Sequence, residues 1–205
     1  RGAGAHPPAH CTDRWRPAAL RRAPLQSTVA LMRRYFAWAA STPVLVGSLT
    51  WSLITLLLLF PALPLGAPML DVRDGYSYAE LLDAMTQYGE HGRRVYAWAS
   101  PSIDTLFPIA YVSLFSGILY RFRPSERLWV TAWIPVAAGV WDLCENAQIT
   151  AMLLIFPAVS ERQVAWASFF THVKIAYIGP AYQLPTIAFL LIALWRVWVR
   201  IRKNR

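Results

Sequence analysis

Charged side chains are scarce in this chain of 205 residues, of which 15% are charged and 56% are hydrophobic. That composition, together with a positive mean hydropathy, excludes an ordinary soluble domain. The net charge of +9 does not indicate nucleic-acid binding, because the basic residues lie at the ends of apolar segments and not on one soluble face. The sequence therefore predicts an integral membrane protein whose partner is membrane lipid, with no nucleic acid bound.

Signatures of metal, haem and redox chemistry are also missing. Of the two cysteines, Cys11 lies in a polar tail and Cys144 within an apolar segment, and neither has CxxC spacing. His172 is the only histidine in an apolar segment, which excludes a bis-histidine haem, and Asp142 and Glu145 lack the Glu-x-x-His partner of a di-iron bundle. The HExxH, GxSxG and P-loop motifs are absent, so we predict no metal and no cofactor.

Internal repeats and strand patterns are absent, but four apolar segments are long enough to cross about 30 Å of hydrocarbon as helices. They predict an all-α fold, a four-helix transmembrane bundle, within a single transmembrane domain of residues 35–200. A basic cytoplasmic tail of residues 201–205 would follow it. The expected spans are residues 43–63, 102–120, 128–156 and 165–195.

The N-terminal part, residues 1–34, is rich in Arg, Pro and Ala and has no apolar periodicity, which is typical of a disordered basic tail. Met32 is followed by two arginines and then an apolar run, and we interpret it as the natural start of the protein. Residues 1–31 would then be upstream translation or a dispensable tail. Sequencing of the native N-terminus tests this hypothesis.

The distribution of Lys and Arg predicts the orientation in the membrane. Seven lie before the first span, three lie in the loop of residues 121–127 and five follow Leu194, whereas four lie on the other side. This bias predicts that both termini are cytoplasmic, which an even number of spans also requires. We expect the protein in a bacterial inner membrane or an equivalent membrane.

Residues 64–101, external in this topology, contain a short helix signal. The segment YSYAELLDAMTQYG, residues 76–89, places apolar residues at helical spacing. Ser77 with Glu80 fits a capping box, and Gly89 fits a helix end. We expect a short amphipathic helix that lies at the outer interface between the first and second spans.

The segment WDLCENAQIT, residues 141–150, places polar groups inside the third span. At 3.6 residues per turn, Asp142, Glu145 and Asn146 occupy an arc of about 100°. The same face carries residues that allow close helix approach, namely Pro135, Ala138 and Gly139. The acids are therefore expected to face the bundle interior and not the lipid.

Two further charges reach a similar depth, Asp104 in the second span and Lys174 in the fourth. Asp104 shares its helix face with Tyr111, and Lys174 shares its face with Tyr177, whereas His172 falls on the opposite face. Three carboxylates and one ammonium should thus converge in the outer half of the bundle. Isolated charges there cost from about 3 kcal/mol upward, so these groups must be paired or reached by water.

A single buried Asp–Lys pair, or an Asp–Asn hydrogen bond, can be a purely structural link between helices. Three carboxylates against one lysine fit this interpretation less well, because at least one acid stays unpaired and can carry a proton. Asp142 and Glu145 lie about one turn apart and cannot ionise independently. We expect Glu145 to be the ionised partner of Lys174 and Asp142 to be the proton carrier.

The chain resembles an uncharacterised family of small four-helix integral membrane proteins with an intramembrane D-x-x-E-N motif. The similarity extends over residues 76–178, about half of the chain. It implies a four-helix membrane fold and selects the same polar residues, but it implies no activity. The matching features are YGEHGRRVY at 88–96, a D-x-x-x-P-x-x-Y pattern (Asp104, Pro108, Tyr111), WDLCENAQIT and the early lysine of the last span, Lys174.

The first of three functional hypotheses is a membrane-embedded enzyme that acts on a lipid or isoprenoid-type substrate near the outer leaflet. Asp142 and Glu145 would be the general acid and base, and Asp104 would tune them. Lys174 or Arg93 would hold an anionic head group. The expected substrate-binding residues are Asn146, Lys174, Tyr111, Tyr177 and Arg93.

The alternatives use the same residues differently. A proton-coupled transporter or carrier would use the carboxylates as a relay, and it would need a homo-oligomer because four helices are few for transport. A structural or partner-binding subunit would use the polar cluster for packing alone. This third hypothesis predicts a fully paired cluster without a cavity.

Overall fold

The computed structural model describes residues 22–204. Its contacts divide the chain into two units, residues 1–34 and residues 35–205, and each is described by itself. Helix α1 (Arg22–Ala39) begins in the first unit. The disorder predicted for the tail falls partly on residues 1–21, outside the described residues. From Arg22 on the chain is helical instead, because its Ala, Leu, Met and Arg residues favour a helix.

Helix α2 (Thr42–Ile54) runs on into one π turn, η1 (Thr55–Leu59). Pro43 lies in its first turn, where a missing N–H costs no hydrogen bond. No side chain of α2 is buried, and its exposed surface is apolar, with Val46, Leu49 and Leu53 among the side chains that point outward. A helix that exposes such a surface requires an apolar solvent.

The predicted capping box is confirmed at the start of α3 (Tyr78–Ala99). The Glu80 backbone N–H donates to the Ser77 hydroxyl over 3.3 Å, and the Ser77 backbone N–H donates to the Glu80 carboxylate over 2.6 Å. Gly89, with φ of 61°, breaks the helix where an end was predicted. The chain then resumes a helix, because Gly tolerates this left-handed conformation without a steric cost.

The first half of α3 packs its apolar face on protein, and its predicted place at the membrane interface stays a prediction. Its residues Leu81, Ala84 and Met85 are fully buried in an apolar core with residues of α5, α6 and the segment that precedes α3. That segment contains a 3₁₀ turn, η2 (Leu70–Val72). The stretch from Leu65 to Tyr88 therefore forms a folded cap over one end of the helices.

Helix α4 (Ile103–Phe122) is followed by a 3₁₀ segment, η3 (Glu126–Ala132), and then by α5 (Trp133–Ile155). The predicted third span begins at residue 128, but the α-helix begins five residues later. Gly139 of α5 faces α4 so closely that a Cβ atom would lie 2.6 Å from Val112. The predicted close approach through a small residue is thus confirmed.

The last helical stretch consists of α6 (Glu161–Val173), a π turn η4 (Lys174–Ile178) and α7 (Gly179–Lys203). Ser160 caps its start by accepting a hydrogen bond from the Gln163 backbone N–H over 3.3 Å. In the π turn the Gly179 N–H donates to the Lys174 carbonyl. This wider turn rotates α7 relative to an uninterrupted α-helix.

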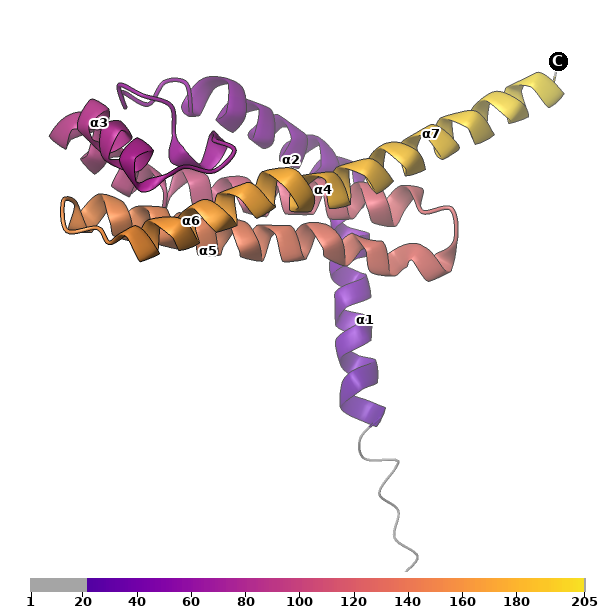
Figure 1. Ribbon diagram of the computed structural model, residues 1–205. Helices are drawn as coiled ribbons and strands as arrows, with labels where there is room; N and C mark the ends of the chain where they lie inside the picture. The colour runs from indigo at the N-terminus through magenta and orange to yellow at the C-terminus, as the bar shows by residue number, and fades with distance from the viewer. Residues whose placement is uncertain (1–21, 205) are drawn as a thin grey trace, which may run out of the picture. The chain divides into compact units, whose positions relative to one another are not determined.

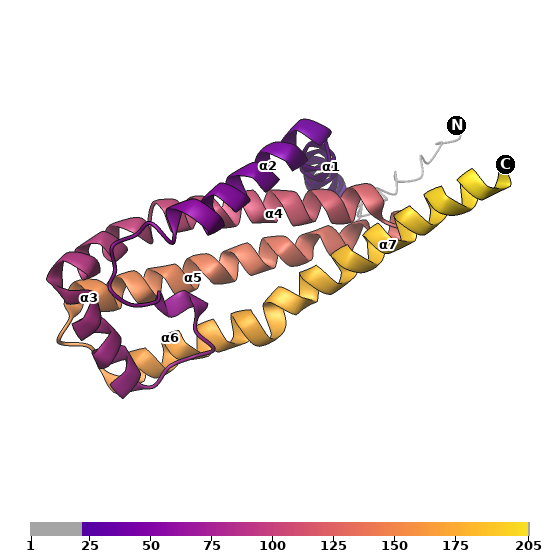
Figure 2. The same ribbon diagram turned by 90° about the horizontal axis from the view of Figure 1, so that it is seen from above.

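The helices of the second unit lie side by side (Figures 1 and 2). α4 is central, because it packs against α2, α5 and α7, while α5 also packs against α3 and α6. The end of α7 extends past the ends of α4 and α5 (Figure 2). α4 and α5 therefore carry the inward-facing residues on which a site can be built.

Within residues 22–204, three helical stretches are long and apolar enough to cross a membrane. They support an integral membrane protein. α5 does not qualify, because Asp142, Glu145 and Asn146 lower its hydropathy. The qualifying stretches are Thr42–Leu59, Tyr78–Phe122 and Glu161–Lys203.

Candidate functional site

The inward face of α5 carries the polar residues that its periodicity places there. Asp142, Glu145 and Asn146 are buried, and Glu145 has no exposed surface. Apolar Val140 and Leu143, on the other side of the helix, are exposed. The predicted burial is confirmed, since only an inward rotation of α5 hides all three polar side chains together.

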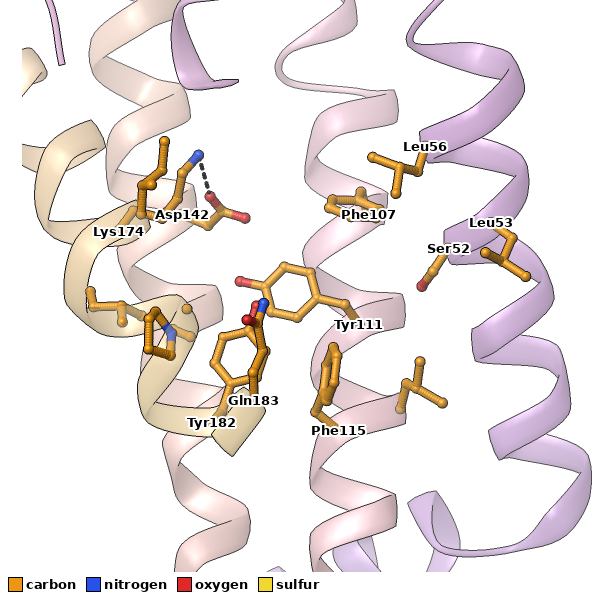
Figure 3. A pocket seen from close by; sticks show the side chains of 16 residues that line it. Ser52, Leu53, Leu56, Phe107, Tyr111, Phe115, Asp142, Lys174, Tyr182 and Gln183 are labelled. Atoms are coloured by element: carbon orange, nitrogen blue, oxygen red, sulfur yellow. Dashed lines mark ion pairs between the residues drawn. The ribbon is translucent and has the colours of Figure 1, made fainter. Parts of the chain in front are cut away.

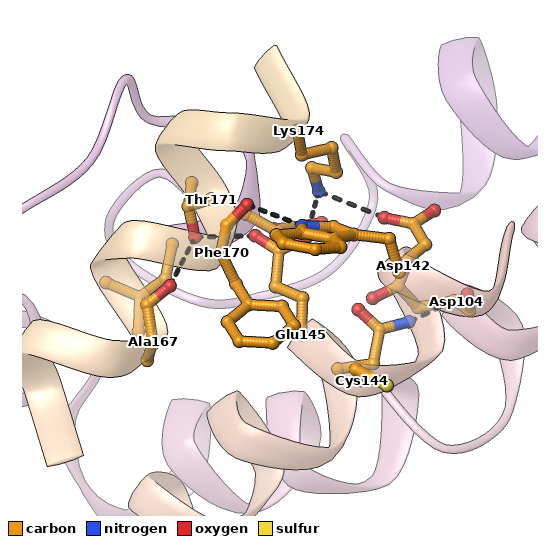
Figure 4. Close-up of polar contacts among 12 residues, drawn as sticks. Asp104, Asp142, Cys144, Glu145, Ala167, Phe170, Thr171 and Lys174 are labelled. Atoms are coloured by element: carbon orange, nitrogen blue, oxygen red, sulfur yellow. Dashed lines mark hydrogen bonds and ion pairs between the residues drawn. The ribbon is translucent and has the colours of Figure 1, made fainter. Parts of the chain in front are cut away.

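Lys174 joins the two acids of α5 (Figure 4). Its Nζ atom lies 2.5 Å from Glu145 Oε2 and 3.2 Å from Asp142 Oδ1. The Thr171 hydroxyl, one turn earlier, donates to Glu145 Oε1 over 2.5 Å. Glu145 is thus held through both carboxylate oxygens, as a charge without solvent must be, while Asp142 is held through one.

Asp104 and Asn146 meet at the junction of α3, α4 and α5. The Asn146 side-chain amide donates to the Asp104 backbone carbonyl over 3.1 Å, and the Ser100 hydroxyl donates to the Asn146 backbone carbonyl over 3.3 Å. Asp104 Oδ2 and Asn146 Oδ1 are buried without a hydrogen-bond partner among the described residues. The polar cluster is therefore not fully paired, in contrast to the expectation for a purely structural link.

A fourth buried carboxylate, Asp71, comes from the cap and was not predicted. The Tyr96 hydroxyl donates to Asp71 Oδ1 over 3.0 Å, and the Leu70 N–H donates to the Tyr96 hydroxyl over 3.1 Å. The Asp71 charge interacts with those of Lys174 and Asp142. The sequence contains no signal for this residue, because a 3₁₀ turn between two loops has no periodicity to follow.

A cavity of about 560 Å³ adjoins the cluster (Figure 3). Its walls come from α2, α4, α5 and the region of η4 and α7. Most of the lining is apolar, and Asp142 and Lys174 form its polar end. The apolar and aromatic lining includes Leu53, Leu56, Phe107, Leu114, Phe115, Ala138, Ile175, Ile178 and Pro180. Such a chamber suits an amphiphilic molecule with one polar end.

The predicted binding residues are placed in different surroundings. Tyr111 lines the cavity, and its hydroxyl interacts with the Asp142 carboxylate. Tyr177 is exposed and contacts the His172 ring edge-on, with centroids 6.3 Å apart. Arg93 lies outside the cavity, where it donates to the Met85 carbonyl over 2.7 Å and covers the Phe156 ring.

Tyr182 and Gln183 line the cavity and were not predicted as site residues. An uninterrupted α-helix would place Tyr177 on the face of Lys174, but the π turn carries an extra residue and moves Tyr182 there instead. The Tyr182 ring stacks on Tyr111 with centroids 5.9 Å apart and packs on Phe115 at 4.7 Å. The only sequence signal for the π turn was Gly179–Pro180, because a proline inside a helix removes a backbone hydrogen-bond donor.

The arrangement can carry out proton transfer at Asp142, the one acid that reaches the cavity. Glu145 pairs with Lys174 and is itself held by the Thr171 hydroxyl. Within residues 22–204, no three His, Cys, Asp or Glu side chains are grouped to hold a metal ion. The carboxylate of Asp142 and the ammonium of Lys174 can take part in acid–base chemistry.

The buried ion pair should contribute to stability in a way that a surface pair does not. Glu145→Gln removes a buried partner of Lys174, so we expect the free energy of unfolding to fall by about 3 kcal/mol. Asp142→Asn should cost less, because Glu145 and Lys174 remain paired. Denaturant titration of the purified variants in detergent micelles measures both values.

The matched control is Glu90→Gln, which removes an exposed pair with Arg94 and should leave stability unchanged. In addition, Glu145→Gln combined with Lys174→Met should cost less than the sum of the single changes, since the two residues act on each other. Additive costs, or a larger loss for Asp142→Asn than for Glu145→Gln, would contradict the pairing.

Asp71 should make stability depend on pH. Burial raises the pKa of Asp71 above its usual value of 3.8, and nearby Lys174 offsets this only in part. A raised pKa means that the folded state binds the proton more tightly, so ionisation destabilises the fold as pH rises above that usual value. Asp71→Asn cannot ionise, yet it keeps an acceptor for Tyr96.

We therefore expect the stability of Asp71→Asn relative to the unchanged protein to increase from about pH 4 to about pH 7. Unfolding in detergent, followed at several pH values, measures this difference. Asp83→Asn, at an exposed acid, is the control and should show no such trend. A difference that is constant, or that shrinks as pH rises, would be incompatible with a raised pKa of Asp71.

Comparison of the chain with protein-family models, with curated proteins and with solved structures gives no match. The resemblance to small four-helix membrane proteins therefore stays a prediction. The function must be argued from the cavity and the groups that border it.

Proposed function

We propose that the protein is a membrane-embedded enzyme that carries out acid–base chemistry on a lipid or isoprenoid-type substrate. The observation that supports this proposal is the cavity, which is apolar along its walls and ends on Asp142 and Lys174. A lipid places its chain against apolar walls and its polar end at the ionisable groups. General acid–base catalysis requires such a group within reach of the reacting atoms.

The proposal includes four membrane crossings. One of them is α5, which is not among the three stretches that are apolar enough to cross a membrane by hydropathy alone. Its 23 residues span about 34 Å as an α-helix. Its Asp142, Glu145 and Asn146 are buried, while its exposed Val140, Leu143 and Leu154 are apolar. The surface that α5 presents to lipid is therefore apolar, although its mean hydropathy is low.

Both termini are cytoplasmic in this proposal, because Lys and Arg are concentrated before α2, between α4 and α5 and at the end of α7. The cap of residues 65–88 then lies on the outer side. The protein would reside in a bacterial inner membrane or an equivalent membrane. Its substrate would enter sideways from the lipid, since α2, which forms one cavity wall, buries none of its own side chains.

Asp142 is the proposed proton carrier, because it lines the cavity and keeps one oxygen directed away from Lys174. Lys174 is held by Glu145 and fixes the position of Asp142. Glu145 itself does not line the cavity, so its proposed role changes from a direct catalyst to a positioning residue. The Asp104 carboxyl interacts electrostatically with Asp142, and the Asn146 side chain bonds to the Asp104 backbone.

Two observations weigh against a purely structural cluster. A structural link predicts full pairing, yet Asp104 Oδ2 has no partner among the described residues. It also predicts tight packing, yet a cavity borders Asp142. A proton-coupled carrier would use the same carboxylates, and it differs from an enzyme in its product: a carrier moves its substrate without changing it.

The proposed topology can be measured with single cysteines, after Cys11 and Cys144 are replaced by serine. A cysteine at Asp83, an exposed position of α3, should react with a membrane-impermeant maleimide on intact cells. A cysteine at Arg127, an exposed position between α4 and α5, should react only after permeabilisation. The reverse pattern would show that the cap lies inside.

The activity can be tested by untargeted lipid analysis of cells that make the protein, and of cells without it. Production of Asp142→Asn should abolish the lipid change, with a loss of about 100-fold or more, as is typical for a general acid or base. Asp83→Asn, the same chemical change at an exposed site, should keep it. A transmembrane redistribution of an unaltered compound would favour the carrier, and equal lipid profiles for Asp142→Asn and the unchanged protein would refute the enzyme.

A further inference from the structure

The positive charge at the polar end of the cavity is already paired with carboxylates. Among the described residues that line the cavity, one basic side chain, Lys174, faces one acidic side chain, Asp142. Lys174 Nζ also lies 2.5 Å from Glu145 Oε2, behind the wall. Two of its three N–H bonds can thus point at carboxylates, which leaves one for a ligand.

Further acids surround this trio. The charge of Lys174 interacts with that of Asp71 in addition to Asp142 and Glu145, and the Asp104 carboxyl interacts with all four. A largely desolvated ammonium requires at least one ionised carboxylate as its partner. With one of these four acids ionised, the acids and Lys174 together have no net charge. Each further acid that ionises makes their net charge more negative.

This balance does not suit an anionic head group, which Lys174 or Arg93 was expected to hold. A phosphate would have to displace a carboxylate from Lys174, or lie beside carboxylates, where the like charges repel each other. Arg93 cannot compensate, because it lies outside the cavity over Phe156. The groups that remain for a ligand are acceptor oxygens, one ammonium N–H and neutral donors.

We infer that the cavity takes an uncharged lipid alcohol, whose hydroxyl donates a hydrogen bond to Asp142 and accepts one from Lys174. A hydroxyl is both donor and acceptor, so it satisfies both groups of the polar end. The Tyr111 hydroxyl points toward this polar end (Figure 3) and borders the place that the ligand hydroxyl would occupy. The inference names the substrate class of the proposed enzyme and in that respect rests on the proposed function.

The walls fit the remainder of such a molecule. Leu53 of α2 and Leu56 of η1 line the cavity together with Ile175 and Ile178 of η4, and so do the stacked rings of Tyr111 and Tyr182. These side chains offer apolar contact along the length of the cavity and no cation. An apolar chain can therefore pack against these walls while its terminal hydroxyl bonds to Asp142 and Lys174.

The test uses three compounds that share one chain: farnesol, farnesyl methyl ether and farnesyl phosphate. The purified full-length protein in zwitterionic nanodiscs is heated with increasing amounts of each compound, since a ligand that binds the folded state raises Tm with concentration. We expect farnesol to bind about tenfold or more tightly than the ether, which cannot donate, and about 100-fold or more tightly than the phosphate.

Two variants locate the effect. Asp142→Asn removes the ionisable carboxyl that would lie beside the phosphate but keeps the shape, so the preference for farnesol over the phosphate should shrink at least about tenfold. Asp83→Asn, at an exposed acid of α3, should keep the full preference. The comparison of the three compounds on the unchanged protein needs neither variant, so it stands even where Asp142→Asn is poorly folded.

The inference is overturned when the phosphate binds as tightly as farnesol, when the ether does so, or when none of the three raises Tm. A preference that is unchanged in Asp142→Asn also overturns it, because the selectivity then arises elsewhere. If the proposed function is wrong but this inference is right, the experiments give a different result. Farnesol would bind selectively while cells with and without the protein keep the same lipids.

Discussion

The site depends on the contact between Lys174 and Glu145, in which the carboxylate is fully buried and the ammonium side chain is 21% exposed. Neither charge is tolerable alone in such surroundings, so each requires the other. Because Glu145 belongs to α5 and Lys174 follows α6, the pair fixes the rotation of both helices. That rotation brings Asp142, one turn from Glu145, to the edge of the cavity and turns the apolar side of α5 outward.

The π turn of residues 174–178 is the second constraint, and it acts on α7. It adds a residue to one turn, so that the helix after Lys174 continues on a shifted phase. Tyr182 and Gln183 thereby reach the cavity, and Tyr177 points to the outside. Without this shift, the wall opposite α2 would consist of other side chains. π turns occur often at functional sites, which agrees with the position of this one.

Periodicity made much of the site predictable. The spacing of Asp142, Glu145 and Asn146 placed them on one face, and the depth of Lys174 placed it near them, because both inferences need only regular helix geometry. Departures from regular geometry were not predictable. The π turn exchanged Tyr177 for Tyr182, the 3₁₀ segment η3 delayed the start of α5, and Asp71 lies in a turn with no period. The capping box at Ser77 was predictable, but the burial of the helix behind it depends on tertiary packing.

The composition of α5 has a consequence for how the chain is assembled in the bilayer. α2 is apolar enough to partition into lipid by itself, whereas α5 carries acids whose partner, Lys174, is synthesised later. In the proposed topology α5 becomes compatible with lipid only when α6 and the π turn accompany it. The last two crossings would thus enter the membrane together as one helical hairpin. The ion pair that positions the site would also neutralise the charges of α5 and Lys174 during insertion.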